Sequence, residues 1–293
     1  MTGPEHDRLR LHDDRALFRE ALRFSAAETG FPARLVEKDY FCSVILEYLA
    51  LTATHLVFRG GTCLAKVHLG FYRLSEDLDF LISMQANASR GERADGVRAS
   101  RTALDGIDRQ LPGLRVLTAL TGANASRQYA AVVGYPSLLA DQQETIRVEI
   151  GLREPLLAPA ITGEAATLLL DPVSGRPMTP VVRVPCVSRD EAMAEKARAA
   201  LSRRELAIRD FYDIDHAVRE LGLRVDGREF VALVKQKLAI PGNDAVDVSS
   251  ARLEALKLQL DAELKPVLRN QDFPLFDLER AFATVVDLAA AVA

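Results

Sequence analysis

Two aspartates stand two positions apart within residues 75–81, and they are the first candidates for chemistry in this chain. If the segment forms a β-strand, Asp77 and Asp79 point to one face, while Leu78 and Phe80 point into the core. Neighbouring carboxylates repel each other, and a divalent cation between them relieves that repulsion. Two oxygen ligands on one strand suit Mg²⁺, which takes its remaining ligands from water and phosphates. The local alternative is a solvated face of an amphipathic strand.

A glycine pair and a hydroxyl residue precede these aspartates. Gly60, Gly61 and Thr62 follow an apolar run at residues 56–58 and open a helical pattern at residues 62–71. Glycines let a backbone turn sharply and approach an anion closely. The helix that follows offers free N–H groups to a phosphate. We expect this turn to bind the phosphates of a nucleotide, although strand–glycine–helix turns also occur for structural reasons alone.

A third carboxylate is expected on a neighbouring strand. Residues 145–150 alternate, so that three apolar side chains face the core while Arg147 and Glu149 face the opposite side. Glu149 is the candidate third metal ligand and the candidate base for an acceptor hydroxyl. An exposed Glu149 that pairs with Arg147 explains the local pattern equally well.

The combination of these segments resembles known enzymes. A Gly-Gly-Thr turn 15 residues before two strand aspartates resembles the motif of the polymerase-β-like nucleotidyltransferase superfamily. Longer blocks resemble one family in particular, the AbiEii/AbiGii toxin nucleotidyltransferases, which include the MenT-type toxins. The matching blocks are residues 37–40 (EKDY), 58–62 (FRGGT), 75–80 (SEDLDF), 146–150 (IRVEI), 195–196 (EK) and 209–213 (RDFYD). The resemblance covers about residues 32–216.

The resemblance implies a Mg²⁺-dependent toxin that transfers nucleotides from an NTP to RNA, at the 3′ acceptor end of tRNA, and so blocks translation. It also implies a cognate antitoxin protein as partner. The metal ligands implied are Asp77, Asp79 and Glu149, and the catalytic set adds Lys196 and Asp210. We expect the nucleotide-binding residues to be Gly60, Gly61, Thr62, Lys66, Ser75 and Arg209. Locally, Lys196 also fits an ordinary solvated helix lysine, and Asp210 fits a charge at a helix N-terminus.

Other acceptors and a non-catalytic role stay open. The same motifs fit nucleotidyl transfer to a small molecule or a protein side chain, or a module that binds nucleotides without turnover. A basic groove near Arg203, Arg204 and Arg209 would favour RNA, because phosphate contacts dominate RNA binding. Ser75 precedes Asp77 by two residues. We therefore hypothesise that phosphorylation of Ser75 would set negative charge against the triphosphate and inactivate the enzyme.

The elements that must position these residues follow from the hydrophobic pattern. We expect an α+β fold in which a nucleotidyltransferase-like mixed sheet, flanked by helices, precedes an α-helical C-terminal part. Predicted helices cover residues 14–29, 32–48, 62–71, 93–111, 189–202, 210–221, 229–238, 251–264 and 275–292. Predicted strands cover residues 56–58, 78–83, 114–120, 129–134, 145–152 and 181–184. Three prolines and a glycine at residues 171–180 suggest a boundary between domains at residues 1–180 and 181–293.

The bulk composition excludes several classes of protein. The 293 residues are 48% hydrophobic and carry a net charge of −4, which is typical of a globular protein and not of a polycation. We expect neither a signal peptide nor a membrane span, and therefore a cytoplasmic protein. Cys42, Cys63 and Cys186 form no C-x-x-C pair, so we expect neither a disulfide framework nor a zinc site, and we expect all three to be core thiols. The five histidines are scattered and predict neither a catalytic triad nor a metal pair.

Overall fold

The chain forms two compact units. The computed structural model describes residues 10–85, 87–140 and 142–293. The first unit comprises Met1–Leu156 and Ala160–Val187, and the second comprises Leu157–Pro159 and Ser188–Ala293. Because nearly all of the second unit follows residue 187, each unit is described separately.

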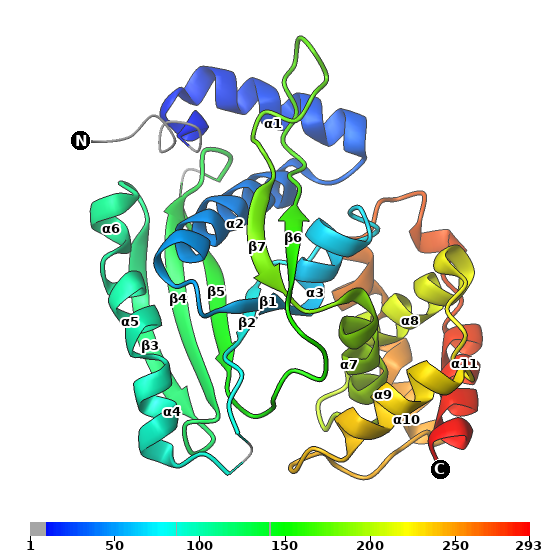
Figure 1. The fold of residues 1–293 in the computed structure, drawn as a ribbon. Helices are drawn as coiled ribbons and strands as arrows, with labels where there is room; N and C mark the ends of the chain where they lie inside the picture. The colour runs from blue at the N-terminus through cyan, green and yellow to red at the C-terminus, as the bar shows by residue number, and fades with distance from the viewer. Residues whose placement is uncertain (1–9, 86, 141) are drawn as a thin grey trace. The chain divides into compact units, whose positions relative to one another are not determined.

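A seven-stranded mixed sheet organises the first unit (Figure 1). The strands are β1 (Val57–Arg59), β2 (Leu78–Leu81), β3 (Arg115–Ala123), β4 (Gln128–Pro136), β5 (Gln143–Gly151), β6 (Ile161–Ala165) and β7 (Val182–Cys186). Their order across the sheet is β3-β4-β5-β2-β1-β7-β6. β2 runs antiparallel to β1 and parallel to β5, and β1 runs parallel to β7. The short strands β1 and β2 therefore lie next to each other at the centre of the sheet and run antiparallel, and each has a parallel neighbour on its other side.

Helices flank this sheet, which confirms the predicted fold class. They are α1 (Arg15–Thr29), α2 (Ala33–Thr52), α3 (Gly60–Cys63), α4 (Arg90–Gly96), α5 (Arg98–Asp105) and α6 (Ile107–Gln110). The central helix α2 lies across the sheet, and α5 and α6 pack along β3 (Figure 1). Phe41 of α2 stacks on Tyr135 of β4 with ring centroids 4.3 Å apart. This aromatic contact helps to fix α2 against the sheet.

Three local features differ from the predicted elements. The helix predicted at residues 93–111 is divided into α4, α5 and α6, with breaks at Val97, which follows Gly96, and at Gly106, because glycine disfavours a helix interior. The helix predicted at residues 62–71 is α3 followed directly by a π-helical segment, η3 (Leu64–His68). The edge strand β6 was not predicted, since its five residues include Gly163 and Glu164, both poor strand formers.

The second unit is built from helices, as predicted for the C-terminal part. They are α7 (Arg189–Ser202), α8 (Ile208–Leu221), α9 (Arg228–Leu238), α10 (Ser250–Lys257) and α11 (Leu278–Val292). Helix α7 is capped at its N-terminus, because the Ser188 hydroxyl accepts the Glu191 N–H at 3.3 Å. The Glu191 carboxylate is buried and pairs with Lys237 at 2.8 Å. Among the helices of the described residues, none has the length and hydropathy that crossing a membrane requires.

Candidate active site

The register of the sheet sets Asp79 beside Glu149. These residues are direct partners on the parallel strands β2 and β5. Paired residues on adjacent strands point to the same face, so the two carboxylates share a face while Phe80 is buried on the other. Asp77 lies immediately before β2, two residues from Asp79. The three acids singled out in the sequence therefore come from neighbouring strands at the middle of the sheet.

Glu149 is held on both sides by polar neighbours. Gln128 Nε2 donates to Glu149 Oε2 at 2.8 Å, and Arg147 Nε lies 2.7 Å from Glu149 Oε1. The Glu149 side chain remains 23% exposed. Each carboxylate oxygen has two lone pairs, so these contacts leave capacity for a cation. The ion pair with Arg147 and a ligand role for Glu149 are thus compatible with the same geometry.

The glycine turn packs directly on the aspartates. Gly60 has a φ of +78°, and a Cβ at this position would lie 2.2 Å from Asp79 Oδ2. Both the left-handed conformation and the close approach require glycine. The hydroxyl of buried Thr62 donates to the backbone carbonyl of Asp77. The turn and the segment that carries the carboxylates are therefore joined through contacts at both Asp77 and Asp79.

Gly61 lies against a serine and a buried arginine. A Cβ at Gly61 would lie 2.8 Å from Ser75 Oγ and 3.0 Å from Arg73 Nη2. Arg73 is only 1% exposed, and its Nη1 donates to the Leu74 carbonyl at 2.9 Å. A guanidinium beside a glycine turn is a typical phosphate-binding group. Sequence analysis missed Arg73, because nothing in its local pattern distinguishes it from a surface arginine.

Lys66, a predicted nucleotide-binding residue, is buried in an ion pair. Its Nζ lies 2.5 Å from Asp39 Oδ1, and the other Asp39 oxygen accepts the Leu168 N–H at 3.0 Å. This pair joins η3 to α2 and to the segment before residue 170. The structure thus gives Lys66 a positioning role, and contact between Lys66 and a phosphate stays a prediction.

Residues 37–40 of α2 contact two segments, the one at residues 137–138 and the one that carries Asp77. Glu37 is fully buried and accepts from Ser137 Oγ at 2.6 Å and from the Leu138 N–H at 2.7 Å. Lys38 Nζ pairs with Glu76 at 2.8 Å, and Glu76 is the residue before Asp77. Residues of α2 therefore fix the approach to the carboxylates.

A second buried carboxylate, Glu154, was also missed in the sequence. Its side chain is almost fully buried, and its Oε1 lies 2.6 Å from Arg59 Nη1. Arg59 is the β1 partner of Asp79, so the two side chains share a face. A buried charge requires a partner, which Arg59 supplies. The arginine that precedes the glycine turn is thereby held beside the candidate metal ligands.

The second unit has a compact charged cluster of its own. Lys196 Nζ lies 2.7 Å from Asp210 Oδ1 and 3.1 Å from Asp213 Oδ2. Both aspartates are buried, and Arg203 Nη1 lies 3.5 Å from the second oxygen of Asp210. Lys196 is therefore not a solvated helix lysine, and the motif residues of α7 and α8 meet. Arg209 is partly exposed and has no ion pair within the described part of the chain.

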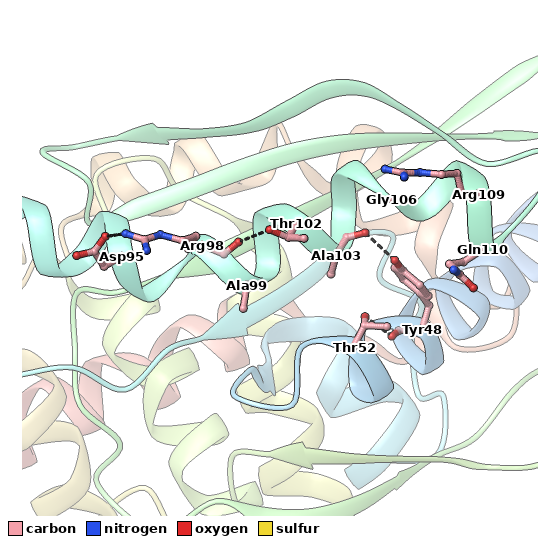
Figure 2. Close-up of a pocket in the computed structure, with 10 residues that line it drawn as sticks. All are labelled: Tyr48, Thr52, Asp95, Arg98, Ala99, Thr102, Ala103, Gly106, Arg109 and Gln110. Atoms are coloured by element: carbon pink, nitrogen blue, oxygen red, sulfur yellow. Dashed lines mark hydrogen bonds and ion pairs between the residues drawn. The ribbon is translucent and has the colours of Figure 1, made fainter.

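A separate pocket of about 700 Å³ lies between α2 and the helices α4 to α6 (Figure 2). Tyr48, Arg98 and Arg109 are among the residues that line it, and the Tyr48 hydroxyl donates to the Ala103 carbonyl at 2.7 Å. None of the candidate site residues lines this pocket. We therefore assign it no part in the chemistry.

Solved structures of bacterial proteins have the same fold as this chain. MenT4, a nucleotidyltransferase toxin from Mycobacterium tuberculosis H37Rv, is 20% identical with a TM-score of 0.59, over 93% of this chain and 88% of that chain. JHP933 from Helicobacter pylori is 17% identical with a TM-score of 0.52, over 89% of this chain and 93% of that chain. At such identities the likeness establishes the fold.

Comparison with family models and curated sequences gives the family. No curated protein sequence matches the chain significantly. The model described as "Nucleotidyl transferase AbiEii toxin, Type IV TA system" matches residues 45–287, which include most of both units. The chain therefore belongs to the AbiEii nucleotidyl transferase toxin family of type IV toxin–antitoxin systems.

Proposed function

We propose that this toxin is a Mg²⁺-dependent enzyme that transfers nucleotides from an NTP to the 3′ acceptor end of tRNA. A nucleotide added there would occupy the end that carries the amino acid, so translation would stop. The observation that carries the proposal is the pairing of Asp79 with Glu149, with Gly60 packed against the Asp79 carboxylate. Inside the cell, a cognate antitoxin protein would be the partner that restrains this activity.

Asp77, Asp79 and Glu149 are assigned as the metal ligands. Their carboxylate oxygens are the donors that Mg²⁺ prefers, and Gly60 leaves room beside Asp79 that any side chain would fill. When bound, Mg²⁺ would supply positive charge against the phosphates as pyrophosphate leaves. Glu149 also accepts the proton of the acceptor hydroxyl, and Arg147 holds its carboxylate in place for that role.

The triphosphate is assigned to the turn at Gly60, Gly61 and Thr62. Ser75 Oγ and the Arg73 guanidinium lie against Gly61, so a phosphate at the turn has a hydroxyl and a cation within reach. Lys66 is assigned to nucleotide binding through its place behind the turn, where its pair with Asp39 anchors the segment that follows Thr62.

Lys196, Asp210 and Arg209 are assigned as the contribution of the second unit. Asp210 and Asp213 hold the Lys196 ammonium from two sides, which fixes its position. An ammonium fixed in this way is suited to a phosphate contact. Arg209, which has no carboxylate partner among the described residues, has all its donors available for nucleotide or RNA phosphates.

RNA is favoured as acceptor over a small molecule or a protein side chain. Arg203, Arg204 and Arg209 lie within seven residues of one another where α7 gives way to α8; the first two are exposed and pair with Asp210 at 3.5 Å and Asp244 at 3.3 Å, and Arg209 is half-buried. Cationic groups gathered in this way suit a polyanion, because phosphate contacts supply most of the affinity for RNA. A single small acceptor would need no such group.

Ser75 is proposed as a point of control by phosphorylation. Its hydroxyl faces Gly61 of the turn, so a phosphoryl group there would occupy the place assigned to the NTP phosphates. We expect Ser75→Glu to lose nucleotide transfer and Ser75→Ala to retain most of it. Full activity of Ser75→Glu in the transfer assay would contradict the idea.

The proposal is tested with each α-labelled NTP, Mg²⁺ and total tRNA. Wild type should label tRNA, the double variant Asp77→Asn, Asp79→Asn should not, and Asp105→Asn, an exposed aspartate of α5, should match wild type. Removal of Mg²⁺ with a chelator should abolish labelling, and its return should restore it. Label on protein or on small molecules alone would refute the RNA assignment. NTP binding without any transfer would refute the enzymatic one.

A further inference from the structure

Two cysteines and a histidine that are far apart in the sequence meet at one place in the first unit. They are Cys63, His68 and Cys186, and their ligand atoms all lie within 4.8 Å of one another. Each residue ends an element, namely α3, η3 and β7. Both cysteines are fully buried, whereas His68 is partly exposed. The proposed transfer chemistry uses none of the three.

The π-helical segment η3 is what brings Cys63 and His68 together. The Leu69 N–H donates to the Leu64 carbonyl, five residues earlier, at 2.8 Å. In an α-helix, residues five apart point about 140° away from each other. The wider π turn brings such residues nearly into line along the helix, and π turns are frequent at functional sites. The unusual helix therefore has a local consequence, which is to put an imidazole beside a thiol.

The surroundings of the cluster orient its ligands. His68 Nε2 lies 3.0 Å from the Val187 carbonyl oxygen. A carbonyl only accepts hydrogen bonds, so Nε2 carries the proton and Nδ1 keeps its lone pair. Metal-binding histidines commonly donate their second N–H to a backbone carbonyl in this way. A Cβ at Gly163 would lie 2.6 Å from the Cys186 sulfur, so this glycine keeps room for it.

We propose that Cys63, His68 and Cys186 form a binding site for Zn²⁺ or another thiophilic divalent cation. Two thiolates and a neutral imidazole offset the charge of a divalent cation, which leaves this buried site neutral. Sulfurs bound to one tetrahedral Zn²⁺ are about 3.8 Å apart for Zn–S bonds of about 2.3 Å. The 4.8 Å limit of the cluster accommodates that separation. A monovalent cation would leave a buried negative charge, which is costly.

The cation would join two parts of the nucleotide-binding region. Cys63 directly follows Thr62 of the glycine turn, and Cys186 ends β7, the neighbour of β1 in the sheet. Three protein ligands leave a fourth position for water, which can approach past the partly exposed His68. Sulfur and imidazole ligands select against Mg²⁺, so this site is chemically distinct from the carboxylates. Because the ligands come together only in the folded chain, binding would stabilise the native state.

Substitution with Co²⁺ tests the site, because thiolate–Co²⁺ bonds absorb in the near ultraviolet and carboxylate–Co²⁺ bonds do not. Reduced protein with counted free thiols is titrated without oxygen, in excess Mg²⁺ that occupies the carboxylates. We expect one equivalent of Co²⁺ to produce the band and Zn²⁺ to remove it. Cys186→Ser and His68→Gln should weaken Co²⁺ affinity on the order of 100-fold. Cys42→Ser, at a buried cysteine outside the cluster, should titrate like wild type.

Thermal unfolding gives a second readout. At a Zn²⁺ concentration about 100-fold above Kd, the Tm of wild type and Cys42→Ser should rise on the order of 5 °C. The Tm of Cys186→Ser should change little. If Cys186→Ser fails to fold, the change in Tm with Zn²⁺ is measured for His68→Gln instead, because the His68 side chain is partly exposed. The proposal is overturned if wild type with free thiols shows no thiolate band, or if the band persists unchanged in folded Cys186→Ser and His68→Gln.

Discussion

Gly60 offers a sharp perturbation of the candidate site, because a single added methyl group reaches a metal ligand. An alanine Cβ would lie 2.2 Å from Asp79 Oδ2, whereas ordinary contact begins at 3.4 Å. The Asp79 carboxylate must therefore move by about 1 Å, and a misplacement of that size costs about 100-fold in rate. This corresponds to about 2.7 kcal/mol of transition-state stabilisation. Gly60→Ala should thus lose about two orders of magnitude of nucleotide transfer.

Backbone strain is a separate effect, and Gly70 isolates it. Gly60 has a φ of +78° and Gly70 a φ of +62°, but a Cβ at Gly70 would meet nothing within 4 Å. A non-glycine residue in the left-handed region costs about 1–2 kcal/mol, which lowers Tm by about 2–8 °C in a chain of this size. Gly70→Ala should show this loss of Tm with nearly normal transfer.

The assay is initial-rate transfer of labelled nucleotide at a temperature well below both Tm values. Under these conditions both variants are folded, and the rates report only the site. The reasoning predicts that Gly60→Ala falls about 100-fold below Gly70→Ala. Rates within threefold of each other would refute the claim that Gly60 is required for the position of Asp79.

Three further predictions concern stability, pH and RNA. Lys66→Met should lower the free energy of unfolding in urea by about 3–5 kcal/mol, because it leaves the buried Asp39 carboxylate without its cation; a loss below about 1 kcal/mol would contradict this reading. Burial lowers the pKa of His12 in the folded protein, so as pH falls His12 is protonated in the unfolded chain before it is protonated in the folded one. Stability should therefore decline below about pH 6.5. The Tm of His12→Asn should depend less steeply on pH in that range, and an unchanged profile would exclude His12 as the cause. Arg204→Gln and Arg209→Gln should each reduce the slope of log Kd for tRNA against log salt by about 1, and unchanged slopes would remove them from the RNA interface.

The sequence predicted what depends on short-range pattern. The alternation at residues 145–150 assigned Glu149 to the face opposite the core, and the register of β5 agrees. The glycine turn at Gly60 was recognised because left-handed turns depend on few residue types. Element boundaries were less accurate, as in the division of residues 93–111 into three helices, because two glycines weaken a helix only by about 1 kcal/mol each.

Contacts between distant segments were beyond the reach of local pattern. From the sequence alone, Arg73 resembles a surface arginine and Glu154 an acidic loop residue. Only the fold places Arg73 beside Gly61 and pairs Glu154 with Arg59. Cys63 and Cys186 were predicted to be buried thiols, and they are. Their approach to His68 depends on a parallel strand and a π turn, neither of which has a reliable sequence pattern.

The account rests most heavily on Glu149 as a metal ligand and base, and one comparison tests this directly. Glu149→Gln and Arg147→Gln each break the same ion pair, but only the first removes a carboxylate from the site. We predict that transfer of labelled nucleotide to tRNA falls on the order of 100-fold or more in Glu149→Gln and stays within a few-fold of wild type in Arg147→Gln. Equal and small losses in both variants would show that Glu149 serves only as the partner of Arg147, and would contradict the proposed site.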